Sequence, residues 1–354
     1  MARALMKGTE AIAEAAIQAG CKYFFGYPIT PQNEIPEYMS ARLPEVGGTY
    51  LQAESEVASI NLLMGGAATG YRVMTTSSSP GISLMSEGIS YIAMAELPCV
   101  IINVSRSGPG LGNILPAQGD YNQATRGGGH GDYSVIVLAP GNLQEAVELT
   151  QDAFELSQKY RTPVMLLADG FMGQMMEAVE IKRRKAEDPS TNAEWAMGWW
   201  DERGGRRVVI RSMLLDPDKM EPHSTYLQKK FAKIRESEAR FEHFMAEDAE
   251  LIVTAYGTTS RVCRSAIHNL RAEGLKVGMV RPITVWPFPV EGYSSLPKSV
   301  RRVLDVEMSP AFQMVDDVRL ATLCDLPVAT EGRWGGYSPS VRQIEDKCKE
   351  LLKK

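Results

Sequence analysis

Apolar runs alternate with helix-length segments through the first half of the chain. Six of these runs predict strands, and most of the stretches between them are long enough for a helix. Strands that alternate with helices indicate an α/β fold, a doubly wound and mostly parallel sheet that binds ligands at the carboxyl ends of its strands. The predicted strands are Lys22–Phe25, Thr49–Gln52, Tyr71–Thr75, Val100–Val104, Ser134–Leu138 and Val164–Leu167.

The alternation stops after residue 180 and resumes near residue 250. Between them lie a charged run, a tryptophan-rich piece (Trp195, Trp199 and Trp200) and a charged stretch with helical character over Tyr226–Met245. The second pattern predicts apolar strands from Leu251 onward, with helices at Ser260–Ala272 and near Val341–Leu352. We therefore expect a larger α/β domain over residues 1–180, a connector over 181–249 and a smaller parallel-sheet α/β domain over 250–354.

Glu56 occupies a position where a helix normally places an apolar side chain. At 100° per residue, Ile60, Leu63 and Ala67 fall within about 40° of Glu56, whereas Glu54 points to the opposite side as a first-turn acid that complements the helix dipole. A buried, unpaired carboxylate costs several kcal/mol unless it meets a partner or keeps a proton. A nitrogen atom of a cofactor is one such partner. Alternatively, Glu56 caps the helix or pairs with a distant arginine.

Three loops follow predicted strands and have the composition of binding loops. In GYPITP (Gly26–Pro31), two prolines fix the backbone so that Thr30 presents its hydroxyl group at a defined place, although a plain turn with Pro31 near the first helical position has the same composition. Arg106 ends a buried strand, where it forms either a clamp for a carboxylate or a structural ion pair with an acid of the next loop. TTSSSPG (Thr75–Gly81) is either an anion-binding nest or a turn with Ser79 as helix cap.

Other motifs carry weaker signals. The glycine clusters Gly108–Gly112 and Gly127–Gly131 predict loops with special backbone angles. His130, within the second cluster, is a candidate acid or base, but a positioned loop residue is the more common interpretation. The methionines of Phe171–Met176 are typical of packing. The chain has no nucleophile elbow, no Walker motif and no GxGxxG after the first strand.

Composition excludes several classes of protein. The net charge of −5, from 38 basic and 43 acidic residues without a long basic run, argues against nucleic acid or an anionic membrane as a partner. No apolar stretch approaches the roughly 18 residues that cross a bilayer, and the first residues lack a secretory or transit pattern, so a cytoplasmic location is expected. Five scattered cysteines without a CxxC pair encode neither a disulfide framework nor a zinc or iron–sulfur site.

Several motifs together resemble the alpha subunits of the thiamine diphosphate-dependent 2-oxoacid:ferredoxin oxidoreductases. They are GYPITP, AESEVASI, TTSSSPGISLMSEGISY, NVSRSGPGLGN and VRPITVWPFP, and the similarity covers nearly the whole chain. The spellings SSSPGISL, GPGLGN and GGGHGDY are most similar to members that act on 3-methyl-2-oxobutanoate (2-ketoisovalerate). The resemblance implies a pyrimidine-binding thiamine diphosphate domain followed by a transketolase C-terminal-like domain.

The resemblance also implies roles for individual residues. Glu56 matches the glutamate that contacts the aminopyrimidine N1′ of thiamine diphosphate in this family. Pro28 and Thr30 match residues beside the cofactor and the substrate, and Arg106 matches an arginine that faces the substrate carboxylate. A buried carboxylate that shares a proton with N1′ favours the imino tautomer of the pyrimidine, which removes the C2 proton, and the cofactor then acts as the electron sink for decarboxylation.

The resemblance departs from the general thiamine pattern at the metal site. Thiamine enzymes bind the diphosphate through Mg²⁺ held by a GDG motif and a later asparagine, and Ala168-Asp169-Gly170 with Asn192 has nearly that spacing. We reject this match, because Asn192 lies in a solvated run that no apolar strand delivers to a metal, and interpret Asp169 as a strand-end residue. A beta subunit is expected to bind the diphosphate and Mg²⁺. Iron–sulfur clusters are expected on gamma and ferredoxin-like delta subunits, with coenzyme A and ferredoxin as further partners.

Three hypotheses follow. The first is the alpha subunit of a heteromeric enzyme that oxidises a 2-oxoacid to its acyl-CoA, with a branched-chain substrate favoured over pyruvate or 2-oxoglutarate. The second is a non-catalytic scaffold that holds partners through Trp195–Trp200 and the charged helix. The third is a self-sufficient thiamine decarboxylase, against which the missing metal motif argues.

Overall fold

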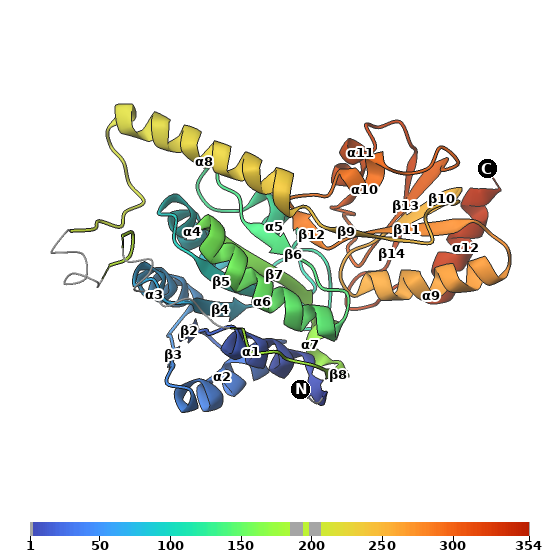
Figure 1. Ribbon diagram of the computed structural model, residues 1–354. Helices are drawn as coiled ribbons and strands as arrows, with labels where there is room; N and C mark the ends of the chain where they lie inside the picture. The colour runs from blue at the N-terminus through green and yellow to red at the C-terminus, as the bar shows by residue number, and fades with distance from the viewer. Residues whose placement is uncertain (1–2, 185–193, 198–206, 354) are drawn as a thin grey trace.

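Two α/β units lie side by side in the computed structural model, which describes residues 3–184, 194–197 and 207–353 (Figure 1). The first unit is built on a seven-stranded sheet with the order β12-β6-β7-β5-β4-β2-β3, parallel except for the edge strand β12. Its strands are β2 (Tyr23–Gly26), β3 (Thr49–Gln52), β4 (Val73–Ser77), β5 (Cys99–Ser105), β6 (Ile136–Leu138), β7 (Pro163–Asp169) and β12 (Thr284–Trp286). All six strands predicted for this half are present, with ends shifted by at most two residues.

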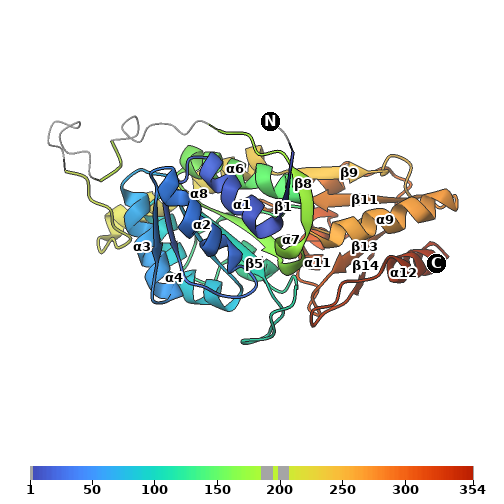
Figure 2. The ribbon, with the colours of Figure 1, turned by 90° about the horizontal axis from the view of Figure 1, so that it is seen from below.

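Helices cover both faces of this sheet. The side chains of β5 show why, since Val100, Ile102 and Val104 enter one apolar core and Ile101 enters the other, so the strand is a continuous apolar run in the sequence. The first core contains α1 (Gly8–Gln18), α2 (Glu34–Glu45) and α6 (Leu143–Tyr160), and the second contains α3 (Glu56–Ala68), α4 (Pro80–Met94) and α5 (Tyr121–Arg126). Figure 2 shows α1 and α2 side by side on one face. The short helix α7 (Gly170–Gln174) and the antiparallel pair β1 (Ala4–Lys7) and β8 (Met176–Val179) complete the unit.

The second unit is a smaller five-stranded sheet with the order β14-β13-β10-β11-β9. Its strands are β9 (Phe241–Phe244), β10 (Leu251–Thr254), β11 (Val277–Pro282), β13 (Arg302–Glu307) and β14 (Val328–Gly332), parallel except for β9. Its helices are α9 (Thr259–Ala272), α10 (Glu291–Ser294), α11 (Val315–Ala321) and α12 (Val341–Leu352). Both helices predicted here are present. The expected fold class, a doubly wound parallel sheet followed by a smaller α/β unit, is therefore confirmed.

The segment between the two patterns differs from its prediction. The charged helix is α8 (Pro217–Glu238), which begins nine residues earlier than Tyr226 and ends seven residues before Met245. Residues 241–244 form β9 instead, because they pair with β11 at the edge of the second sheet. The apolar face of α8 packs into the core of the first unit through Leu227, Phe231 and Ile234 (Figure 1).

A second difference is β12, which follows β11 in the chain but joins the first sheet. It pairs antiparallel with β6, so that Thr284 lies opposite Leu138 and Trp286 opposite Val137. Phe231 of α8 meets the Trp286 ring edge-on, with centroids 6.0 Å apart. The segment after β11 is therefore held to the first unit by strand pairing and by side-chain packing.

Gln118 fastens the loop after β5 to the second unit. Its side-chain amide donates to the Tyr256 carbonyl oxygen (2.9 Å), and its side-chain oxygen accepts from the Thr259 hydroxyl (2.7 Å) and the Met308 amide (2.9 Å). Gln118 is 3% exposed, so each of these bonds is shielded from water. The loop that carries the predicted substrate arginine is thus held against the second unit.

Asp305 and Glu307 form a buried acid pair at the carboxyl end of β13. The fully buried Asp305 carboxyl group lies beside the fully buried Glu307, and Glu307 accepts from the Gln313 and Met314 amides. Burial and the neighbouring Glu307 raise the pKa of Asp305 well above its ordinary value. The folded protein therefore holds a proton here that the unfolded chain releases near pH 4.

We expect Asp305→Asn to stabilise the protein at neutral pH. The wild-type protein loses stability as pH rises from the ordinary aspartate pKa towards the raised pKa of Asp305. The asparagine amide does not titrate, so the variant does not lose this stability. The gain should be about 1–3 kcal/mol at pH 7, comparable with the cost of one unsatisfied buried polar group, and should shrink below pH 4. Urea unfolding of both proteins at pH 4 and pH 8 measures it. A gain that is equal at both pH values, or a loss at pH 8, would contradict the assigned protonation.

Among the helices of the described residues, none combines the length and the apolar character needed to cross a membrane.

Candidate active site

The connections between strands change direction at β2, and this creates a crevice at the carboxyl edge of the first sheet. From β2 the chain passes through α2 on one face to the edge strand β3, and it returns through α3 on the other face to β4, on the opposite side of β2. Ligands of open α/β sheets bind where connections leave in opposite directions in this way. The loops after β2, β3, β4 and β5 all end at this edge.

Glu56 is the first residue of α3 and is buried, with 6% of its surface exposed. Ile60, Leu63 and Ala67 are buried below it on the same face, whereas Glu54 is exposed, as their spacing predicts. Glu54 is not a first-turn acid, since it precedes the helix. The cap is Ser55, whose Oγ accepts from the Ala58 amide (3.1 Å), so the capping alternative for Glu56 is wrong.

The Glu56 carboxylate lies against the first turn of α4. A Cβ atom added to Gly81 would stand 2.8 Å from Glu56 Oε1 and 2.0 Å from Ser77 Oγ, so glycine is required for this approach. Among the described residues, no hydrogen bond or ion pair reaches this carboxylate, and the distant arginine of the other alternative is not found. The buried hydroxyl groups of Ser77 and Ser78 also lack partners there. An acid and two hydroxyl groups with unused hydrogen-bonding capacity therefore lie beside the start of α4.

Arg106 directly follows β5 and is 6% exposed. Its Nη1 donates to the Thr30 carbonyl oxygen (2.8 Å) and its Nη2 to the Leu111 carbonyl oxygen (3.1 Å), while its Nε is buried without a partner. No described carboxylate forms a salt bridge with it, so the predicted alternative of a structural ion pair is not observed. A guanidinium carries five N–H donors, so three remain for a ligand.

The loop after β2 brings Thr30 to Arg106. Thr30 is half-buried and Pro28 is exposed, and the buried Gln32 ties the loop to β4 by accepting from the Thr76 hydroxyl (2.5 Å). Helix α2 begins at Glu34, three residues after Pro31, so this segment is not a tight turn into the helix. The contact between Thr30 and Arg106 joins two of the predicted site residues directly.

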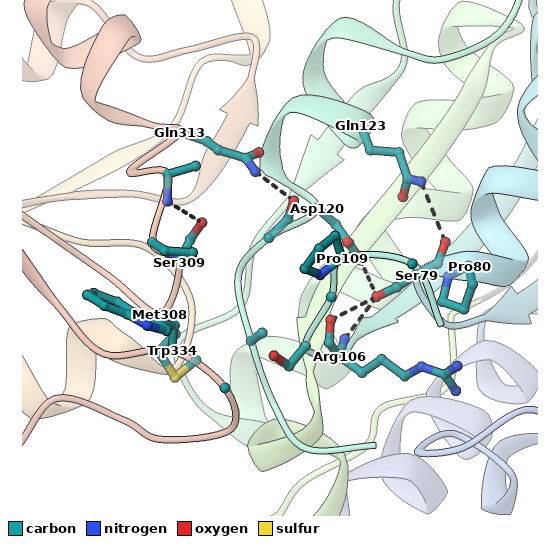
Figure 3. A pocket seen from close by; sticks show the side chains of 18 of the residues that line it. Ser79, Pro80, Arg106, Pro109, Asp120, Gln123, Met308, Ser309, Gln313 and Trp334 are labelled. Atoms are coloured by element: carbon teal, nitrogen blue, oxygen red, sulfur yellow. Dashed lines mark hydrogen bonds between the residues drawn. The ribbon is translucent and has the colours of Figure 1, made fainter. Parts of the chain in front are cut away.

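Ser79 occupies the position before α4 but does not cap it. Its Oγ donates to Asp120 Oδ2 (2.6 Å) and accepts from the Arg106 amide (2.9 Å), and its own amide donates to Asn103 Oδ1 (3.1 Å). Asn103 Nδ2 donates to Asp120 Oδ2 (2.9 Å). Figure 3 shows Ser79 between Asp120 and the main chain of Arg106. The prediction of Ser79 as a helix cap is therefore wrong, because its hydroxyl group serves this network instead.

A cavity of about 620 Å³ lies between the two units beside this network. The first unit contributes Ser79, Arg106 and Asp120, and the second contributes Met308 and Trp334 on the opposite wall (Figure 3). The guanidinium of Arg106 extends away from Met308 and Trp334, towards the first unit. The second unit therefore completes the wall of a cavity whose charged groups come from the first.

Asp169 uses one oxygen of its carboxylate to cap α7. It ends β7 as interpreted from the sequence, and its Oδ1 accepts from the Phe171 and Met172 amides at the start of α7. Asn192, its rejected companion, lies outside the described residues. Within residues 3–184, 194–197 and 207–353, no group of three or more histidine, cysteine or acidic side chains is arranged to hold a metal ion.

The other candidates lie apart from this network. His130 is exposed and lines a second hollow with α4 and α8. Met172 is fully buried, as packing predicts, although Met176 is exposed. Trp195 stacks under Arg161 of its own chain, 4.9 Å from the guanidinium carbon, and Trp199 and Trp200 lie outside the described residues. The structure thus brings Glu56, Thr30 and Arg106 to one edge of one sheet.

Sequence relationships define the class of protein. Residues 14–242 match the family of pyruvate flavodoxin/ferredoxin oxidoreductase thiamine diphosphate-binding domains, and residues 249–344 match pyruvate:ferredoxin oxidoreductase core domain II. The chain belongs to this oxidoreductase family, as its motifs predict. It is 48% identical over 352 residues to a ketoisovalerate oxidoreductase subunit VorB of Methanothermobacter marburgensis, covering 99% of this chain and 98% of that protein. It is 40% identical to a 2-oxoglutarate synthase subunit KorA of Methanocaldococcus jannaschii, covering 80% and 83%.

Solved structures agree with this assignment. A 2-oxoglutarate:ferredoxin oxidoreductase from Magnetococcus marinus, with 2-oxoglutarate, coenzyme A and succinyl-CoA bound, superposes with a TM-score of 0.87 at 28% identity. The match covers 99% of this chain and 65% of that chain, so the present chain spans about two thirds of the longer protein. A split-gene transketolase matches with a TM-score of 0.59 at 13% identity and supports the fold alone.

Proposed function

We propose that this chain is the alpha subunit of a multi-subunit 2-oxoacid:ferredoxin oxidoreductase, which converts 3-methyl-2-oxobutanoate to its acyl-CoA and passes electrons to ferredoxin. The observation that carries the proposal is the buried Glu56 carboxylate, which has no partner among the described residues at the point where α/β sheets bind ligands. Isolated, such a group costs several kcal/mol, and a ring nitrogen of a bound cofactor offsets that cost.

The crevice fits the aminopyrimidine end of thiamine diphosphate. It offers one acid, the unpartnered hydroxyl groups of Ser77 and Ser78, and the close approach of Glu56 to the start of α4 that Gly81 permits. When bound, thiamine diphosphate supplies the electron sink that decarboxylation of a 2-oxoacid requires. Glu56, whose carboxylate has no partner among the described residues, would then hold a proton at the ring nitrogen N1′.

Arg106 and Thr30 hold the substrate in this proposal. The free Nε–H and the second hydrogens on Nη1 and Nη2 give Arg106 the donors for a planar carboxylate. The bonds to the Thr30 and Leu111 carbonyl oxygens fix the guanidinium before any ligand arrives. Thr30 places its loop beside the guanidinium, and Pro28 restricts the same loop next to the cofactor.

The cavity favours a 2-oxoacid with an uncharged side chain. Arg106 is the one cationic group among the described residues that line it, and Pro109, Leu111, Ala117, Met308 and Trp334 supply apolar surface. A dicarboxylic acid such as 2-oxoglutarate would bring a second carboxylate without a cation to meet it. A buried charge without a partner costs several kcal/mol. This charge balance, together with the similarity to ketoisovalerate oxidoreductase subunits, favours a branched-chain monocarboxylic substrate.

The rest of the active site belongs to other subunits in this proposal. A beta subunit binds the diphosphate and Mg²⁺, and gamma and ferredoxin-like delta subunits carry iron–sulfur clusters that pass electrons to ferredoxin. This division accounts for the engagement of Asp169 in capping α7 and for the five cysteines without a CxxC pair. Coenzyme A accepts the acyl group. The location proposed for the complex is the cytoplasm.

The test is oxidation of 2-oxoacids by the assembled complex. With coenzyme A and a viologen dye as electron acceptor, kcat/KM for 3-methyl-2-oxobutanoate is expected to exceed that for 2-oxoglutarate by about 10²-fold or more, the ratio that one uncompensated buried charge implies. The isolated chain, with thiamine diphosphate and Mg²⁺ added, is the control and is expected to be inactive. Equal kcat/KM for the two acids would refute the substrate assignment, and full turnover by the isolated chain would refute the shared site.

A further inference from the structure

Asp120 is at the centre of a buried network that connects two loops of the active-site edge with strand β5. Its carboxylate accepts from Ser79 Oγ (2.6 Å), which precedes α4, and from Asn103 Nδ2 (2.9 Å) on β5. Asp120 itself lies in the loop after β5 and is 8% exposed, while Asn103 is fully buried. Because a carboxylate oxygen accepts two bonds here, its position is set by two elements at once.

The network holds Ser79 in an unusual backbone conformation. Ser79 has φ 24° and ψ −82°, a strained conformation that residues other than glycine rarely adopt. The Ser79 amide donates to Asn103 Oδ1 (3.1 Å) and its hydroxyl group donates to Asp120. These two bonds offset the strain, so the conformation depends on them.

Ser79 in turn determines the positions of both proposed site groups. Its Oγ accepts from the Arg106 amide (2.9 Å), which fixes the main chain that carries the guanidinium. Two residues further on, Gly81 provides the surface against which the Glu56 carboxylate lies. A shift of Ser79 therefore moves Arg106 and the wall of the Glu56 crevice together.

We propose that Asp120 is a positioning residue for this reaction, which acts through Ser79 to hold Arg106 and the start of α4 in register with Glu56. This inference rests on the proposed function, since it concerns the same site. Asp120 acts as a hydrogen-bond acceptor, and the neutral amide of asparagine can supply that acceptor in its place. Burial raises the pKa of Asp120, while the bonds from Ser79 and Asn103 lower it, which agrees with a role that does not require charge.

The test compares Asp120→Leu with Asp120→Asn in the assembled complex. Leucine removes the acceptor, and a displacement of about 1 Å in a positioned group costs about 10²-fold in rate. We expect Asp120→Leu to lower kcat/KM for the 2-oxoacid by about that factor, mainly through KM, and to weaken binding of thiamine diphosphate, measured by isothermal titration calorimetry. Asp120→Asn should restore most of both. Ser79→Ala should reproduce the KM defect, and the double variant should be no worse than Asp120→Leu.

Glu238→Leu provides the matched control. Glu238 is similarly buried, at 6% exposed, and accepts from Lys159 Nζ and Tyr160 Oη at 2.6 Å, but it does not line the cavity. We expect it to lower the melting temperature without changing KM. The inference is overturned if Asp120→Leu reduces activity only in proportion to lost complex with KM unchanged, or if Asp120→Asn is as defective as Asp120→Leu. An inactive wild-type complex would instead refute the proposed function.

Discussion

Replacement of Glu56 by glutamine is expected to lower kcat for 2-oxoacid oxidation by about 10²-fold or more, the range that proton transfer by a positioned side chain contributes. Glutamine has the same shape and fits the same space beside Gly81, but it does not exchange a proton with a ring nitrogen. The assembled complex should keep its melting temperature, since no hydrogen bond or ion pair to the Glu56 carboxylate is lost among the described residues. Dye reduction under saturating substrate and thiamine diphosphate measures the change.

Glu54→Gln is the control for this prediction. Glu54 is two residues away and exposed, and its replacement removes a carboxylate just before the start of α3. It should leave kcat within a factor of about two, as expected of a surface substitution. Similar losses of kcat in both variants would mean that activity depends on the net charge near α3 and that Glu56 has no specific partner.

Replacement of Arg106 by leucine is expected to raise KM for the 2-oxoacid and to lower kcat/KM by about 10²- to 10³-fold, the cost of removing one partner of a buried charge pair. Arg106→Lys should be intermediate, because it keeps the charge but loses the planar fork that matches a carboxylate. Initial rates over a range of substrate concentrations separate the two parameters. An unchanged KM in Arg106→Leu would contradict a clamp for the substrate.

Part of the effect at Arg106 is structural. Leucine leaves the Thr30 and Leu111 carbonyl oxygens without their donor, so some loss of stability is expected as well. Arg301→Leu, at an exposed arginine of the second unit, controls for loss of positive charge. Melting temperatures of the complexes then distinguish a loosened loop from a weakened substrate contact.

The pattern of apolar and polar residues predicted those site residues whose positions follow from the helix or strand that carries them. Glu56 was identifiable because a helix has 3.6 residues per turn, so a charged group on the stripe of Ile60 and Leu63 stands out. Arg106 was identifiable because it ends an apolar run. In both cases the helix or strand that carries the side chain determines where it lies, so no contact with a distant part of the chain has to be known.

Features that depend on distant contacts escaped prediction. The pairing of β12 with β6 joins Thr284 to Leu138, and nothing in either short run indicates which sheet it enters. Likewise, the sequence left Ser79 either in an anion-binding nest or as a helix cap, because its true partner, Asp120, is 41 residues away. The one local sign in the sequence was Gly81, two residues later, because a residue without a Cβ atom allows the turn to approach another side chain closely. Hydrogen bonds across the sheet edge are set by the tertiary fold, which single-residue patterns do not encode.

The central claim is that Glu56 meets the aminopyrimidine ring of a cofactor whose diphosphate end another subunit holds. A cryo-electron microscopy structure of the assembled complex with thiamine diphosphate tests it most directly. The account predicts a Glu56 carboxylate oxygen within hydrogen-bond distance of N1′, about 2.6–3.0 Å, and Mg²⁺ coordinated by the partner subunit. A Glu56 side chain in contact with solvent or paired with an arginine, with the cofactor held elsewhere, would contradict it.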